Sequence, residues 1–256
     1  TAIGALALTA NTTGASNTAV GRSALGANTT GDLNTAVGYN ALSAQTANAY
    51  NTAVGGNSME ATTTGSWSAA LGRLSLASNT TGGYLTAVGY GALAANTTAN
   101  NNTAFGYASL YANTTGEYNV AVGAYALDAN TTGSRCIAIG GLALTTLTTG
   151  SFNVAMGHNS MAGLTTGTQN VAIGNYALDA ATSSNYNVAI GNYALTTTTT
   201  GEQCVAVGYE SLANNTGHFN CALGFQSLEA NTTGTNNTAI GHNAMDVNTT
   251  GIDNTA

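Results

Sequence analysis

Residues 18–34 read TAVGRSALGANTTGDLN, and this stretch decides the fold because it recurs along the whole chain. The copies begin at residues 1, 18, 35, 52, 69, 86, 103, 120, 137, 154, 171, 188, 205, 221 and 238, and all have the same length except the copy 205–220, which is shorter by one. We number the positions of each copy from 1 to 17. In all fifteen copies position 2 is Ala, position 4 is Gly, position 3 is apolar and position 8 is Leu or Met. Such a fixed period predicts a repeat architecture.

The repeat length indicates which architecture. Seventeen residues are too few for paired-helix repeats and fewer than leucine-rich repeats use, but they suit one coil of a β-solenoid. We expect a short strand at positions 1 to 4, where the Gly marks a bend or a close backbone approach, and a second strand at positions 7 to 9. The segment Ala-Asn-Thr-Thr-Gly at positions 10 to 14 predicts a turn whose Gly adopts a positive φ. The fold class is therefore all-β, a parallel β-solenoid of fifteen 17-residue coils.

The same pattern predicts the interior and the faces of the strand. We expect the side chains of positions 3 and 8 to form the core, and the Asn at position 17 of eleven copies to hydrogen-bond from coil to coil. Because position 2 never becomes polar or large, both faces of the strand are expected to be covered, one of them by a partner chain. The sequence does not decide which face meets the partner. The alternative is that Ala fits a tight interior.

Composition excludes several classes of function. The chain has three Arg, no Lys and a net charge of −7, which argues against nucleic-acid binding and excludes a phosphate-binding P-loop and Schiff-base chemistry. The 43% hydrophobic and 5% charged residues argue against disorder. No apolar run is long enough to span a bilayer and no signal-peptide pattern is present, so we expect no membrane insertion in this segment. The chain opens and stops within the motif, so residues 1–256 are interpreted as a single array from a longer fibre.

No combination of residues predicts catalysis. Acidic residues at matching positions are mostly several coils apart, and His158 and His242 are separated by five coils, so no metal site, cofactor or enzymatic activity is expected. Cys204 and Cys221 stand on adjacent positions of neighbouring strands and should point to opposite faces. We therefore expect these two residues and Cys136 to be buried free thiols.

Aromatic residues form the candidate site. Tyr50, Trp67 and Tyr84 occupy position 16 of three successive coils, a position where other copies have Ser16 or Asp253, so the coil itself does not require an aromatic residue there. These three are candidate contacts for a ligand such as a sugar, or for another chain. The alternative is that they cap the edge of the core. The same alternatives apply to the tyrosines at position 5, which are Tyr39, Tyr90, Tyr107 and Tyr209.

The motif Asn-Thr-Ala-Val-Gly followed two residues later by Ala/Ser-Leu, as in residues 17–25, 34–42 and, with Ile and Met as variants, 237–245, resembles a known family. It is similar to the head repeats of YadA-like trimeric autotransporter adhesins and to related repeats in phage tail fibres, and the resemblance covers the whole chain. It implies a left-handed β-roll, three chains about a common axis, and a surface fibre that adheres to host matrix or cells.

These observations predict a structural segment of an extracellular fibre, adhesive in role, on a cell or virion surface. Its expected partners are copies of itself, as a homotrimer or filament, and a host surface or glycan. The alternative is a monomeric β-solenoid that presents a glycan- or ice-binding face.

Overall fold

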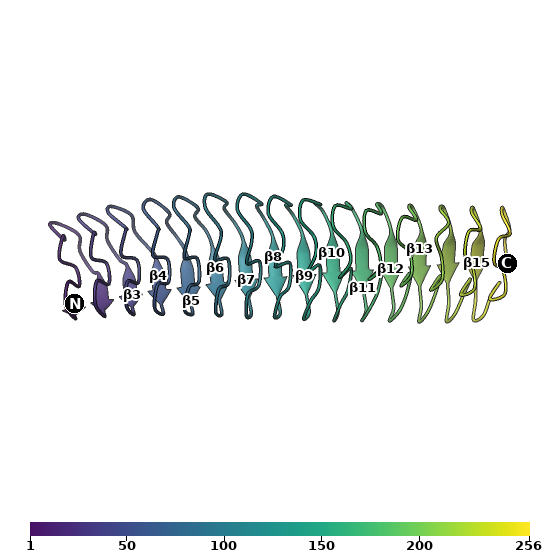
Figure 1. The fold of residues 1–256 in the computed structure, drawn as a ribbon, viewed down its shortest axis with the longest axis horizontal. Coiled ribbons are helices and arrows are strands. Elements are labelled where there is room, and N and C mark those ends of the chain that lie inside the picture. The colour runs from purple at the N-terminus through teal and green to yellow at the C-terminus, as the bar shows by residue number, and fades with distance from the viewer. The chain divides into compact units, whose positions relative to one another are not determined.

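The computed structural model describes residues 1–256 and contains one short strand in each repeat copy and no helix (Figure 1). The chain divides into two compact units, unit 1 (Thr1–Thr132) and unit 2 (Gly133–Ala256). The strands of unit 1 are β1 (Ala2–Ile3), β2 (Thr18–Val20), β3 (Thr35–Val37), β4 (Thr52–Val54), β5 (Ala69–Leu71), β6 (Thr86–Val88), β7 (Thr103–Phe105) and β8 (Val120–Val122). Those of unit 2 are β9 (Ile137–Ile139), β10 (Val154–Met156), β11 (Val171–Ile173), β12 (Val188–Ile190), β13 (Val205–Val207), β14 (Cys221–Leu223) and β15 (Thr238–Ile240).

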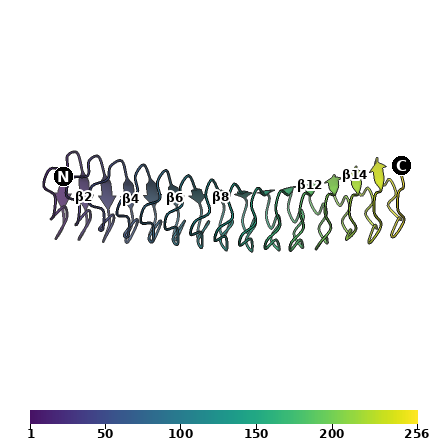
Figure 2. The ribbon, with the colours of Figure 1, turned by 90° about the horizontal axis from the view of Figure 1, so that it is seen from above.

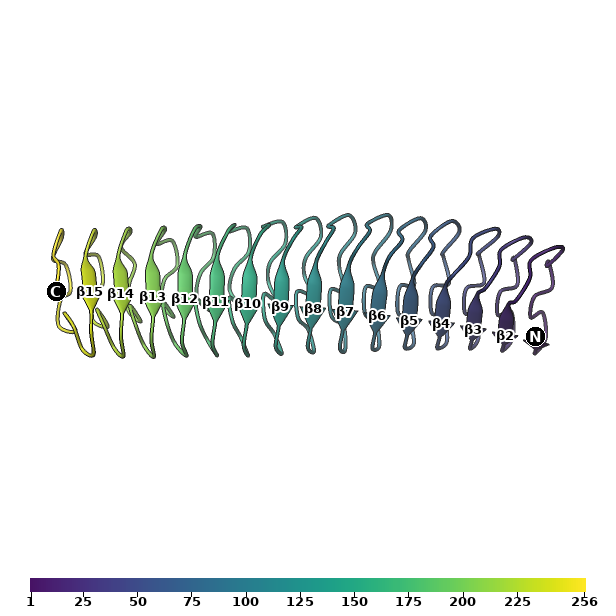
Figure 3. The ribbon, with the colours of Figure 1, turned by 180° about the vertical axis from the view of Figure 1, so that it is seen from behind.

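Within each unit, every strand pairs in parallel with the next strand of the chain. Val154 pairs with Val171, which stands at the same position of the next copy, and Val205 pairs with Cys221 in the same way. The copy that contains β13 lacks one residue in its turn, so its strand stays in register. Figure 3 shows the strands of unit 2 side by side in chain order. The predicted parallel β-solenoid, with one strand per copy, is confirmed.

The core of each unit is formed by positions 2, 7 and 8. Ala172 and Ala189 of position 2 and Leu178 and Leu195 of position 8 have no exposed surface, and position 7 is a small Ala or Ser. Position 3 points the other way: Ile190 remains 37% exposed. The prediction of a core at position 8 is confirmed, whereas the prediction for position 3 is wrong. Because strand side chains alternate, an inward Ala at position 2 places position 3 on the outer face.

The segment after the strand is a turn region, so the predicted second strand at positions 7 to 9 is wrong. Residues at positions 6 and 8 have left-handed backbone conformations, as at Ser23 (φ 58°) and Leu25 (φ 50°), because the coil must turn its corner here. The backbone still bonds to the next coil, since the N–H of Leu25 donates to the carbonyl oxygen of Ala41 at 3.0 Å. In unit 2 the loops that close the coils lie on one side of the strands in the view of Figure 2.

The two repeating glycines have different roles. Gly38, at position 4, has a φ of +137°, and a Cβ on it would lie 2.5 Å from the carbonyl oxygen of Gly55, so the predicted bend and close approach are confirmed. The predicted positive φ at position 14 is wrong. Gly14 lies outside the left-handed region, but a Cβ on it would lie 2.5 Å from the carbonyl oxygen of Gly31 in the next coil. The positive φ occurs instead at position 16, as at Trp67 (φ 60°).

Asparagine side chains connect each coil to the next. At position 17, the backbone N–H of Asn34 donates to Oδ1 of Asn17 at 2.9 Å, and its Nδ2 donates to the carbonyl oxygen of Asn48 at 2.8 Å. The predicted hydrogen bonding between coils is confirmed. A second, unpredicted series lies at position 11, where the buried Nδ2 of Asn96 donates to Oδ1 of Asn79 at 3.0 Å. These bonds satisfy polar groups that burial would otherwise leave unpaired.

Candidate interaction surfaces

The outer face of the strands is apolar and open. We call the outward side chains of positions 1 and 3 the apolar strip. Position 3 is aliphatic, Met or Phe in every copy, and no copy has a charged residue at position 1 or 3. In unit 2, position 1 is also aliphatic in five of seven strands, whereas in unit 1 it is mostly Thr. Among the position 3 residues outside the terminal strands, the most exposed are Phe105 (55%), Leu71 (51%) and Leu223 (46%).

This arrangement decides which face a partner chain could cover. Ala121 and the other position 2 residues beyond the terminal strand β1 lie buried inside the coil, so this face is covered within the single chain, and the cover of the opposite face by a partner chain stays a prediction. The interpretation that Ala fits a tight interior is correct. The face accessible to another chain is the apolar strip. Continuous exposed apolar surfaces of this kind mark interaction sites in soluble proteins.

The structure joins two of the three predicted site residues. The rings of Tyr50 and Trp67 stack with centroids 4.1 Å apart and an interplanar angle of 12°. Both are about half exposed, and Tyr84 of the next coil is 63% exposed without a ring contact. All three residues have φ near +60°, which directs position 16 away from the core. The alternative that they cap the edge of the core is therefore not supported within one chain.

A longer aromatic series runs through unit 2. Every copy from 154 to 254 has one aromatic ring at position 5 or 6, and successive rings contact each other at centroid distances between 5.2 and 6.1 Å. The series is His158, Tyr176, Tyr193, Tyr209, Phe225 and His242. Sequence reasoning missed Tyr176, Tyr193 and Phe225 because it compared only the tyrosines of position 5. The available signal was an aromatic ring of any type at either of the two adjacent positions in six successive copies.

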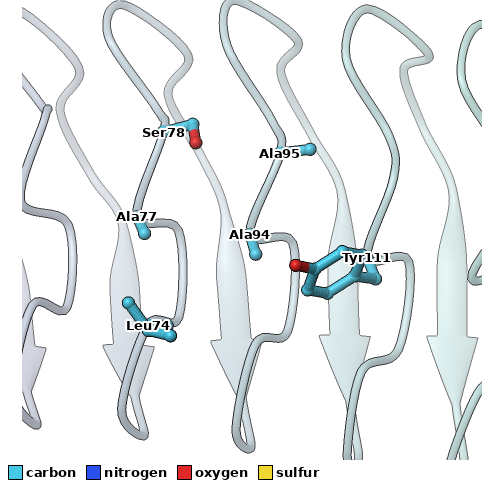
Figure 4. Close-up of a pocket in the computed structure, with 6 residues that line it drawn as sticks. All are labelled: Leu74, Ala77, Ser78, Ala94, Ala95 and Tyr111. Atoms are coloured by element: carbon cyan, nitrogen blue, oxygen red, sulfur yellow. The ribbon is translucent and has the colours of Figure 1, made fainter.

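Unit 1 has a related cluster beside two hollows. Tyr90 and Tyr107 stack at 5.3 Å, and Tyr125 meets Tyr107 edge-on at 5.2 Å. A hydrogen bond with Tyr125 is the main cause that raises the pKa of Tyr107. Tyr111 contributes to both hollows: one of about 170 Å³ toward the preceding coils, where its ring reaches toward Ala94 (Figure 4), and one of about 300 Å³ with the other three tyrosines.

None of the three cysteines forms a disulfide. The predicted burial is confirmed for Cys136 and Cys204 but wrong for Cys221, which is half-buried on the apolar strip. Burial raises the pKa of the Cys136 thiol to about 11 and also raises that of Cys204. The opposite sides taken by Cys204 and Cys221 agree with their adjacent strand positions. No three His, Cys, Asp or Glu side chains lie close enough to share a metal ion.

Comparison with known proteins gives no relative: no protein-family model, curated protein or solved structure matches this chain. None of its structural elements is a helix with the length and apolarity that crossing a membrane requires.

Proposed function

We propose that this chain is a structural segment of an extracellular fibre in which copies of the chain pack against one another through the apolar strip. The observation that carries the proposal is position 3 of the strip, which is apolar in all fifteen copies although its side chain points outward. A side chain selected only for solubility would be charged or polar in some copies, as position 1 is Thr in seven of them. An outward position that is apolar in every copy therefore indicates selection for contact.

The energetic scale supports self-association. Fully burying a Val, Leu, Ile or Met contributes about 1.5–3 kcal/mol, so covering a side chain that is a third or more exposed contributes about 0.5–1 kcal/mol. In unit 2, six of the seven position 3 side chains are exposed to this extent, and six from each of two chains contribute roughly 6–12 kcal/mol. This matches the roughly 4–15 kcal/mol that association costs. The aliphatic residues of position 1 in unit 2, such as Val171 and Val188, move the balance toward assembly.

Periodicity favours packing with the chains parallel and in register. The strands of each unit repeat at one spacing, so the side chains of two parallel strips meet at every coil. The resemblance to trimeric adhesin head repeats supports three chains, a surface location and an adhesive role. The hydroxyls of the threonines at position 12 are not free for ice binding, because Thr29 and its equivalents donate to backbone carbonyl oxygens of the next coil, at 3.0 Å to Thr46.

The test is the mass in solution of the full chain by analytical ultracentrifugation. We expect the native sequence to form an oligomer with a mass that is a multiple of 25.3 kDa. Replacing Ile173 and Ile190 by Glu should give a folded monomer, because it places charge on the strip. The matched control is Ser183→Glu, which adds the same type of charge to an exposed turn between these strands and should leave the oligomer intact. A native chain that stays monomeric at high concentration would refute the proposal.

Cys221 reports the register of the packed chains. If the chains are parallel and in register, their Cys221 residues lie at the same level of the strip, and mild oxidation should give a disulfide-linked dimer that reductant reverses. Cys221→Ser should abolish this product, since the other two thiols are buried. An assembled chain that yields no such dimer would contradict the in-register arrangement.

A further inference from the structure

One part of unit 1 departs from the repeat in a way that the coil does not require. Tyr111 stands at position 9, where no other copy has an aromatic residue, and Gly91 is the only glycine at position 6. The two departures depend on each other: a Cβ on Gly91 would lie 3.2 Å from two ring carbons of Tyr111, tighter than ordinary contact. The absence of a side chain at residue 91 therefore allows the Tyr111 ring to lie across the preceding coil.

Tyr111 completes the larger hollow. Its lining comes from three successive coils of unit 1 and consists of Tyr90, Tyr107, Ala108, Tyr111, Tyr125 and Asp128. Tyr90 and Tyr107 are nearly parallel, whereas Tyr125 is turned by 66° relative to Tyr107, so the rings meet the hollow in different orientations. The four tyrosines are between 40% and 49% exposed. The hollow of about 300 Å³ therefore opens to solvent between phenol rings and a carboxylate.

We infer that this hollow binds one neutral pyranose ring of a glycan. A pyranose has apolar C–H faces, which pack against aromatic rings, and hydroxyl groups at its rim, which donate and accept hydrogen bonds. The phenol hydroxyls both donate and accept, and the carboxylate of Asp128 accepts from sugar hydroxyls in charge-assisted hydrogen bonds. The volume lies at the small end of ligand pockets, which suits a single ring. The open side leaves room for the glycan to continue.

Charge selects among sugars. The lining has one carboxylate and no basic residue, and the whole chain carries a net charge of −7. The guanidinium of Arg73 lies 5.8 Å from the centroid of the Tyr90 ring, so one cation and one carboxylate border the hollow. Because these two charges balance, the site favours a neutral sugar over a charged one. The site lies on the turn side of the coil, at positions 5, 6 and 9, and not on the apolar strip. Its occupancy is therefore independent of the proposed self-association, and it assigns the chain a binding activity besides its structural role.

The test is saturation-transfer NMR on the full chain with the methyl glycosides of galactose, glucose, mannose and N-acetylglucosamine. We expect at least one of them to bind, and binding to weaken by about tenfold or more in Tyr111→Ala, the scale of a lost aromatic stack. Gly91→Asn is the second variant. Asn already occupies position 6 with a positive φ in four copies, including Asn40 and Asn57, so this change keeps the coil and displaces only the Tyr111 ring.

The matched control is Tyr186→Ala, which removes an exposed tyrosine of unit 2 and should leave glycoside binding unchanged. Circular dichroism checks that each variant keeps its fold. The inference is overturned if no glycoside binds, if binding persists in both Tyr111→Ala and Gly91→Asn, or if Tyr186→Ala weakens it as much. Binding of choline without any glycoside would also overturn it, because the tyrosines would then form a cage for a quaternary ammonium ion.

Discussion

Introducing a phenylalanine at position 2 or at position 3 of one strand tests which of the two side chains points into the core. Ala189 in β12 has no exposed surface and pairs in register with Ala172 on one side and Ala206 on the other. Neighbouring strands lie about 4.8 Å apart, so a ring at residue 189 has no free space between these methyl groups. Adding only a few methylene groups to a well-packed core already lowers the free energy of unfolding by roughly 1–3 kcal/mol. We expect Ala189→Phe to lower the free energy of unfolding by about 3 kcal/mol or more.

The matched variant is Ile190→Phe, one residue further along the strand. Ile190 points outward, and Phe105 already occupies the equivalent position of β7. This change should alter the free energy of unfolding by less than about 0.5 kcal/mol. Urea unfolding followed by circular dichroism measures both values, and two protein concentrations separate any contribution from assembly. If Ala189→Phe is tolerated, or if Ile190→Phe costs more than Ala189→Phe, the inward direction of position 2 is refuted.

Three further changes test the backbone and the buried thiol. Leu93→Val should lower the free energy of unfolding, measured with urea, by about 2–4 kcal/mol, because a β-branched residue does not fit the φ of 53° and leaves a gap. Leu93→Met should lower it by less than about 1.5 kcal/mol. Equal losses for the two variants would contradict the assigned conformation. Gly38→Ala should cost more than about 1 kcal/mol, because its φ is +137° and its Cβ would meet a carbonyl oxygen, and Gly56→Ala, with open space around it, should cost almost nothing. The pKa of Cys136 is raised from 9.0 to about 11, so the unfolded chain ionises first, and the free energy of unfolding should fall as the pH rises from 9.0 to about 11. A pH titration of Cys136→Ala should show a smaller loss, because Cys204, whose pKa burial also raises, is still present.

Periodicity predicted the fold because a 17-residue repeat has few ways to bury its Leu or Met. It could not predict the direction of the strand. Ala189 and Ile190 are both apolar, as are their equivalents in every copy, so the alternation that normally separates core from surface is missing. The outer face is apolar as well, and only the structure shows that the smaller residue is inside. When both faces of a strand are apolar, the sequence does not indicate which face is buried in the core.

The turn region and the candidate site were predicted less well, for related reasons. Leucine rarely adopts a positive φ, so residue type gave no reason to expect one at Leu25, and the segment resembled a strand. Positions 5 and 6 of successive coils share one surface, as the contact of Tyr193 at position 6 with Tyr209 at position 5 shows, with ring centroids 6.1 Å apart. Tyr50 and Trp67 were found from sequence because they share one position.

The missing residue of the copy 205–220 has a consequence for how such a chain can change in length. Its strand pairs normally with both neighbours, because the turn absorbs the deletion and the next copy begins in phase. The loss of one residue at this turn therefore leaves the strand register unchanged. Duplication or loss of a whole copy between two others within a unit recreates the same contacts at the junction, since each coil meets only near-identical neighbours. Unequal recombination within the coding sequence can thus adjust the length of the array without any new packing having to evolve.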